Sequence, residues 1–226
     1  MTSAEVAAWT AAIATLLAVI VALFKEDLAA LWRRPRLTAR IRLSPPDCHR
    51  TDVTVTNPQT GAVINTRPCY YLRIWIENVG KVRGEQVQVF VRRLLRKHAD
   101  ALFKEEPQFL PMNLKWSHTG DVFAKGISPK MGQFCDVGHI VHPSKTAVAG
   151  HSLPGVQLGK VTMCLDLEVA PNTKTHLLPP GIYRLELLVG AANCNPSSKT
   201  AELTITGEWF DDQTKMFSEG LGLREV

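Results

Sequence analysis

In Tyr71-Leu72-Arg73-Ile74-Trp75-Ile76-Glu77, aliphatic side chains fall on every second residue. Successive side chains of a β-strand point to opposite faces of the sheet, so this period of two indicates a strand with one buried face. The same alternation returns in Val87-Gln88-Val89-Phe90-Val91. Two such runs close together predict neighbouring strands of an antiparallel sheet.

Short apolar runs rich in β-branched residues continue over most of the chain after residue 36. They are Leu37–Leu43, Asp52–Val55, Tyr70–Glu77, Gln86–Leu95, Lys160–Val169, Ile182–Val189 and Ala201–Thr206. Clusters of Pro, Gly and Asn between them, such as Pro179-Pro180-Gly181, are typical of turns. About seven short strands with such turns predict a mainly β fold, an antiparallel β-sandwich over residues 37–207. No long amphipathic helix is expected after Pro35.

The alternation also predicts which side chains form the core, with the register of each strand left open. The expected inward residues are Trp75, Ile74 or Ile76, Val89, Leu165, Tyr183 and Leu185. Truncation of a buried aromatic side chain costs about 3–5 kcal/mol, so Trp75→Ala is expected to unfold most of the domain.

Two local patterns carry a resemblance to a known family. The run from Tyr71 to Asn78-Val79-Gly80, followed by Gln86–Val91, resembles the strand, turn and strand of immunoglobulin-like and CARDB-type modules. Gly181-Ile182-Tyr183-Arg184-Leu185 resembles the approach to a tyrosine corner, in which a Tyr hydroxyl bonds back to the chain. The resemblance covers about a third of the chain and implies an immunoglobulin-like sandwich, but no particular function.

The N-terminal region has a different character, because nineteen residues, Val6–Phe24, pass without a charge between Glu5 and Lys25. A helix of that length spans about 28 Å, close to the hydrocarbon core of a bilayer. We therefore expect a short tail over residues 1–5 and a transmembrane helix over residues 6–24. The alternative, a cleaved signal peptide, normally has a basic segment before the apolar core, and Met1–Glu5 has none.

Basic residues follow the apolar segment and do not precede it. They are Lys25, Arg33, Arg34, Arg36, Arg40 and Arg42. Because Lys and Arg near a span are retained on the cytoplasmic side, we expect a single-pass protein of the inner or plasma membrane with a cytoplasmic C-terminal domain. The five scattered cysteines suit a reducing compartment. An extracytoplasmic adhesion-type domain, which often carries a disulfide, remains the inverted alternative.

Residues 25–36 are expected to form a basic juxtamembrane helix or linker, with Leu28, Leu31 and Trp32 at helical spacing and Pro35 as its stop. Trp32, Arg33, Arg34 and Arg36 are the candidate lipid-facing residues, and membrane lipid is an expected partner. Residues 25–42 hold six basic and two acidic side chains, whereas the net charge of the whole chain is +5. Since the basic excess lies beside the membrane, no nucleic acid is expected as a partner.

Small residues mark one face of the apolar segment. Ala7, Ala11, Ala14, Ala18 and Ala22 share a stripe that allows helices to approach closely, so a homo-oligomer through this face is compatible with the sequence. The alternative is that Ala is simply common in membrane spans, and the second set Ala8, Ala12 and Thr15 is consistent with that.

A loop-rich insertion is expected over residues 98–154, where prolines are frequent and alternation is weak. Long loops that keep aromatic residues are more often functional than disordered. We therefore expect a binding surface here, formed by Trp116, Phe109, Phe123 and His118, with Trp116 as its anchor. The alternative is that these aromatic residues cap an open end of the sandwich.

The same insertion contains Cys135, His139 and His142, which are residue types that bind zinc or support nucleophilic catalysis. Their spacing matches no common zinc motif, and the chain has no phosphate-binding loop, dinucleotide fingerprint or hydrolase elbow. No catalytic residue, metal ligand or cofactor is therefore assigned. Residues 208–226 are expected to be a short tail.

These features favour a non-enzymatic binding, sensor or scaffold module, tethered to a membrane and contacting a protein partner or a small ligand. The alternative of a different class is a membrane-anchored hydrolase or metal-dependent enzyme that uses the insertion 98–154.

Overall fold

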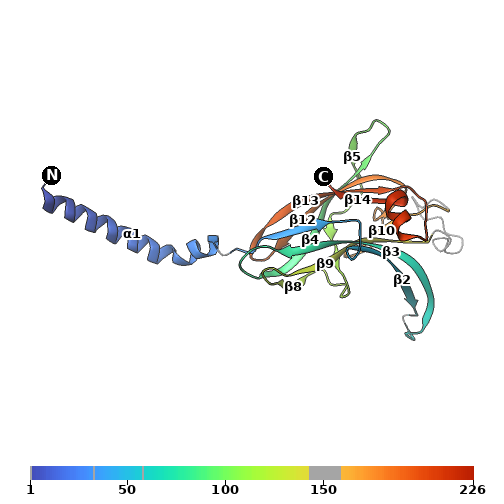
Figure 1. Ribbon diagram of the computed structural model, residues 1–226, viewed down its shortest axis with the longest axis horizontal. Coiled ribbons are helices and arrows are strands. Elements are labelled where there is room, and N and C mark those ends of the chain that lie inside the picture. The colour runs from blue at the N-terminus through green and yellow to red at the C-terminus, as the bar shows by residue number, and fades with distance from the viewer. Residues whose placement is uncertain (1, 33, 58, 143–158) are drawn as a thin grey trace.

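The protein is mainly β, with one N-terminal helix followed by two antiparallel sheets (Figure 1). The computed structural model describes residues 2–32, 34–57, 59–142 and 159–226. This architecture confirms the predicted fold class. The two sheets share one hydrophobic core, which gives the body a sandwich-like arrangement.

Helix α1 (Ser3–Trp32) is a single continuous helix, so the segment expected to be a juxtamembrane helix or linker is helical as far as Trp32 and continues the apolar segment. Its segment Ser3–Lys25 is long and apolar enough to cross a membrane, and none of that segment is buried by the rest of the protein. Leu16 and Leu23, for example, are exposed on its surface. The helix ends before Pro35, as expected, because the ring of a proline clashes with the residue before it when that residue is helical.

The first sheet is built around the long strand β3 (Val63–Asn78). Its order is β1 (Leu37–Ile41), β3, β9 (Gly132–Val141), β10 (Met163–Leu165) and β11 (Leu177–Leu178). Two further strands pair off this path: β2 (Cys48–Thr56) with β3, and β7 (Lys115–Trp116) with β9.

The second sheet is built around β4 (Gly84–Lys97) and β12 (Gly181–Ala191). Its order is β14 (Leu221–Glu225), β13 (Cys194–Ile205), β12, β4 and β5 (Phe103–Glu105). Strands β6 (Met112–Asn113) and β8 (Ala124–Ile127) pair with β4. A short helix α2 (Gln213–Lys215) and a π-helical turn η2 (Met216–Gly220) precede β14.

The alternation along β3 sets the core face, but not in the register expected for Trp75. Ile74 and Ile76 are fully buried, whereas Trp75 lies on the opposite face and is only half-buried, against Phe134 and Arg40. The expectation that Trp75 is a core residue was therefore wrong. The inward positions predicted for Val89, Leu165, Tyr183 and Leu185 are confirmed.

Both local patterns of the sequence form the hydrogen bonds that hold a turn in place. Asn78 Oδ1 accepts from the amide of Gly80 at 2.9 Å, and Asn78 Nδ2 donates to the carbonyl of Val82 at 2.7 Å. The Tyr183 hydroxyl donates to the carbonyl of Pro179, four residues earlier, at 2.8 Å. Each bond fixes the chain where it enters or leaves a long strand.

The described part of the insertion, residues 98–142, is not a loop-rich excursion. It contributes β5 to β9, and β9 pairs with β3 over nine residue positions in the middle of the first sheet. β9 lacks a regular alternation of apolar residues, because it contains Gly132 and Gly138, and the sequence pattern therefore does not predict it. The rest of the predicted insertion, residues 143–154, lies outside the described residues.

The C-terminal segment is also part of the sandwich and not a tail. β14 pairs with β13 from Ala201↔Glu225 to Ile205↔Leu221, and Leu221 and Leu223 are buried in the core. The N-cap residue Asp212 accepts from the amide of Lys215 and begins the helical turn that leads into this strand.

Candidate functional site

A polar pocket of about 370 Å³ lies on the outer face of the first sheet, opposite the core. We call it the outer-face pocket. It is formed by β2, β3, β9 and the turn after β7, and its lining residues are His49, Thr51, Asp52, Thr54, Tyr71, Arg73, Ser117, His118 and Asp136.

A β-bulge places the side chains of β9 that surround this pocket. β3 and β9 pair Leu72 with Gly138 and Arg73 with Asp136, which leaves Val137 as the additional residue of β9. The extra residue resets the alternation of side chains along the strand. As a result Asp136 and His139, three residues apart, both leave the core, while Val137 stays fully buried.

Arg73 is the central residue of the pocket, and its side chain is 93% buried, with a relative exposure of 7%. The Nη2 atom of Arg73 lies 2.9 Å from Nε2 of the His49 imidazole. The centre of its guanidinium lies 5.3 Å from the centre of the Phe134 ring. Its Nε is buried without a hydrogen-bond partner. Among the residues that the structure describes, no carboxylate lies within ion-pairing distance of Arg73.

Asp136 faces the same pocket and accepts a hydrogen bond of 2.5 Å from the Ser117 hydroxyl. Burial raises the pKa of Asp136, and the hydrogen bond from Ser117 and the charge of Arg73 lower it only in part. Burial, followed by the charges of Arg73 and His118, lowers the pKa of His49. Burial thus disfavours the charged form of both groups without changing the permanent charge of the Arg73 guanidinium.

Tyr71 connects the pocket to a second polar pair on the same face. Its ring packs against His139, with 5.4 Å between ring centres, and His139 Nδ1 lies 2.9 Å from Asp166 Oδ1. Burial and the charge of Asp166 raise the pKa of Tyr71 to about 12, so its hydroxyl stays a hydrogen-bond donor at neutral pH. His49, Tyr71 and His139 occupy one row across β2, β3 and β9.

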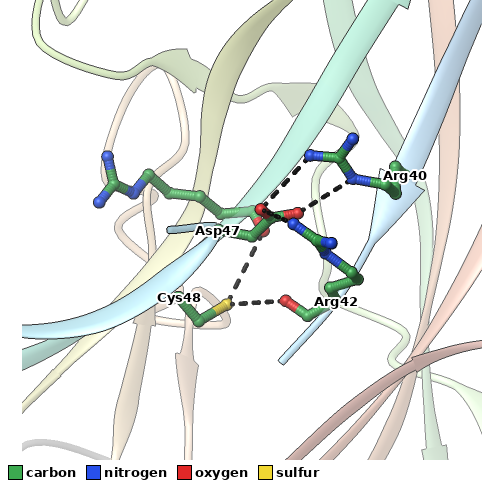
Figure 2. A network of polar contacts seen from close by, with 5 residues as sticks. Arg40, Arg42, Asp47 and Cys48 are labelled. Carbon is green, nitrogen blue, oxygen red and sulfur yellow. Dashed lines mark hydrogen bonds and ion pairs between the residues drawn. The ribbon is translucent and has the colours of Figure 1, made fainter. Parts of the chain in front are cut away.

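The start of β2, which carries His49, is fixed by a buried carboxylate (Figure 2). Asp47 is fully buried and pairs with Arg42 at 2.9 Å and with Arg40 at 3.4 Å. The adjacent Cys48 thiol donates to the carbonyl of Arg42 at 3.3 Å and lies 3.8 Å from the carbonyl of Arg73. Burial raises the pKa of Cys48 to about 11, so this thiol is a structural donor and not a nucleophile.

The structure separates the four residues predicted to form a binding surface. Trp116 is fully buried and Phe109 is 8% exposed, so neither presents a surface to a partner, and the prediction of Trp116 as an exposed anchor was wrong. Phe123 is 50% exposed. His118, also exposed, lies next to the pocket and is the member of the predicted set that lines it.

The Cys135, His139 and His142 side chains point to three different places. The thiol of Cys135 is buried in the core and donates to the carbonyl of Lys115 at 3.3 Å, and burial raises its pKa well above the ordinary value. His139 pairs with Asp166, and the His142 ring packs against Trp209. Sequence proximity therefore does not bring these three groups together, and none of them shares a site with another.

The predicted lipid-facing residues are described in part. Arg34 and Arg36 are exposed beside the end of α1, whereas Arg33 and the side chain of Trp32 lie outside the described residues. The alanine stripe from Ala7 to Ala22 is exposed along α1.

Comparison of the chain with protein-family models, with curated proteins and with solved structures finds no match. The site is therefore interpreted from its own geometry. Sequence reasoning missed its central residue, because Arg73 occupies an outward position of β3, where the alternation predicts an exposed polar side chain. Its burial on that outer face depends on His49 and Phe134, which come from other strands.

Proposed function

We propose that this protein is a single-pass membrane protein whose sandwich domain is a non-enzymatic binding module, with the outer-face pocket as its ligand site. Three features support the proposal. The Ser3–Lys25 segment of α1 is apolar and uncovered. Among the residues that the structure describes, the hydrophobic core runs from Leu37 to Leu223 and includes no side chain of α1. The pocket gathers polar groups from distant parts of the chain.

Arg73 is the single observation that carries the binding role. A buried cation is costly unless a charged partner or several hydrogen bonds compensate for it. The contacts of Arg73 with His49 and Phe134 supply no negative charge, and its Nε has no acceptor. An anionic group entering the pocket would supply both, so the ligand we propose carries a carboxylate or a phosphate.

Asp136 adds a second requirement on the ligand. Its carboxylate faces the same pocket and would repel an anionic group placed beside it. Ser117 occupies only one of its oxygens. The ligand therefore needs a hydrogen-bond donor on the side that meets Asp136, in addition to the anionic group that meets Arg73.

Cytoplasmic placement of the domain is part of the proposal. It is supported by the basic residues that follow the apolar segment and by the five cysteines, all of which are free. Burial raises the pKa of Cys69 to about 12 and that of Cys164 to about 11, so both thiols are protonated at neutral pH.

The experiment is a thermal unfolding series on the full-length protein in lipid nanodiscs, with inorganic phosphate, acetate and glutamate as probes and KCl at equal ionic strength as the reference. A ligand at ten times its Kd adds about 1.4 kcal/mol to the free energy of unfolding. The expected result is a rise in Tm of about 3–6 °C with at least one probe.

Arg73→Gln should abolish that rise, whereas the control Arg92→Gln, which alters an exposed pair with Glu186 on the second sheet, should retain it. Ser117→Ala provides a milder change at the same pocket if Arg73→Gln fails to fold. Equal Tm values in phosphate, acetate, glutamate and KCl for the wild-type protein would contradict the proposed ligand class.

A further inference from the structure

The connection between α1 and the sandwich is packed against the body. The amide of Arg36 donates to Asn78 Oδ1 at 3.2 Å, and the amide of Val79 donates to the carbonyl of Arg36 at 2.8 Å. Gly80 lies so close to the backbone of residues 34–36 that a Cβ atom there has no room. These contacts hold the end of the sandwich that contains Asn78, Val79 and Gly80 next to the C-terminal end of α1.

Asn78 also joins a second turn to this end. Its amide donates to the carbonyl of Met131 at 3.0 Å, and its carbonyl accepts from the amide of Lys130 at 2.8 Å. Its side-chain nitrogen donates to the carbonyl of Ile127 at 2.9 Å. Residues 34–36, the β3–β4 turn 79–83 and the β8–β9 turn 128–131 thus form one continuous surface, which we call the anchor-side surface.

The anchor-side surface combines exposed apolar and cationic side chains. Val79 is 56% exposed and Met131 is 62% exposed. Exposed cationic side chains accompany them, namely Arg34, Arg36, Lys81, Arg83 and Lys130. The acidic residue paired within this region is Glu85, which lies 3.4 Å from Arg83. Apolar side chains framed by Lys and Arg match the boundary of an anionic bilayer, where cations meet the headgroups.

Chain length brings this surface to the membrane. α1 ends at Trp32, and the four residues from Trp32 to Arg36 span at most about 14 Å. The part of α1 after Lys25 adds about 10 Å if it stands upright, and less if it tilts. We infer that the anchor-side surface rests on the headgroups of anionic phospholipid, an inference that depends on the proposal that α1 crosses the membrane.

Contact between the anchor-side surface and the headgroups would also fix the distance of the outer-face pocket from the membrane. Arg73 lies five residues before Asn78 on β3, which corresponds to roughly 17 Å along the strand. The pocket would then stand beside the membrane and open to a soluble ligand, while the anchor-side surface limits rotation of the domain relative to the membrane.

The test places a fluorescent amino acid at residue 131 or residue 102 of the full-length protein. Leu102 is a matched control, because it is 61% exposed and follows Lys97, which ends β4 roughly 40 Å from Gly84 at the anchor side. The protein is reconstituted in vesicles of phosphatidylcholine alone or with 30% phosphatidylserine, and quenching by a headgroup spin-labelled lipid is measured.

In the vesicles with phosphatidylserine, the probe at 131 should be quenched at least twofold more than the probe at 102. The double variant Lys81→Gln, Lys130→Gln should reduce that difference by half or more, and Lys97→Gln, Lys104→Gln, which removes two charges at the other end of β4, should not. Equal quenching at 131 and 102 in a protein that floats with the vesicles would overturn the lipid contact of the anchor-side surface. It would leave the proposal that α1 crosses the membrane intact. Failure to float would overturn the membrane anchor as well.

Discussion

The indole Nε1 of Trp116 donates a hydrogen bond of 3.2 Å to the backbone carbonyl of Val87, and this bond joins the two sheets. Trp116 belongs to β7 on the first sheet, and Val87 belongs to β4 on the second. Both side chains are fully buried. The ring therefore fills space between the sheets and leaves no buried indole donor unpaired, which defines Trp116 as a core residue.

Trp116→Ala should accordingly lower the free energy of unfolding by about 3–5 kcal/mol, because it leaves a large cavity and an unpaired carbonyl. Trp116→Phe should cost less, since it retains most of the packing and loses the hydrogen bond. Phe123→Ala, at a half-exposed ring, should change stability by about 0.5 kcal/mol or less. Urea unfolding followed by circular dichroism measures all three, and a Trp116→Ala protein as stable as Phe123→Ala would refute the core assignment.

The two faces of β3 offer a matched pair of substitutions. Ile76→Ala removes a fully buried side chain and should cost about 2–5 kcal/mol. Trp75→Ala should cost less despite the larger side chain, because Trp75 is half-buried and its main contact is an edge-to-face packing with Phe134 at 4.7 Å between ring centres. The same denaturation experiment ranks the pair, and a larger loss for Trp75→Ala would show that the register of β3 is wrong.

Arg73→Met separates a ligand-binding role from a structural one. If the buried guanidinium serves a ligand, replacing it with an apolar side chain of similar length should leave the Tm of the unliganded protein unchanged or raised, because an uncompensated charge is removed. The same variant should lose the stabilisation by phosphate or carboxylate. A Tm that falls by 10 °C or more would instead indicate that Arg73 holds β2, β3 and β9 together.

The pH dependence of stability should report His49. Burial and the charges of Arg73 and His118 lower its pKa, so the unfolded chain binds a proton more readily than the folded one. The neutral form therefore contributes stability that is present above the unfolded value of about 6.5 and is lost as the pH falls below it. His49→Gln should lose less stability than wild type between pH 7 and pH 5, whereas His98→Gln, at an exposed position, should follow the wild type.

Sidedness follows from the flanking charges. Because Lys25 and the arginines after it follow the apolar segment, a reporter fused after Val226 should behave as cytoplasmic. Paired reporters, one active only inside the cell and one active only outside, measure this directly. Activity of the outside reporter would favour the inverted topology and remove the support that the free cysteines give to a reducing compartment.

Local patterns were sufficient to predict the class of fold and the apolar helix. An uncharged run the length of a bilayer, such as Val6–Phe24, is a property of consecutive residues, and so is the alternation in β3, β4 and β12. The hydrogen bonds of Asn78 with Gly80 and of Tyr183 with Pro179 are similarly short in range, because each joins a side chain to backbone within four residues. These features need no knowledge of what lies across the sheet.

Tertiary structure decided the rest, since it depends on contacts between distant residues. A strand pattern cannot show that β9 enters the middle of the first sheet or that a bulge at Val137 turns Asp136 and His139 to one face. Nor can it show that Trp116 is buried, because that requires β4 to lie beneath it. Arg73 is an ordinary outward residue in the sequence, and it becomes a buried charge only when His49 from β2 and Phe134 from β9 close over it.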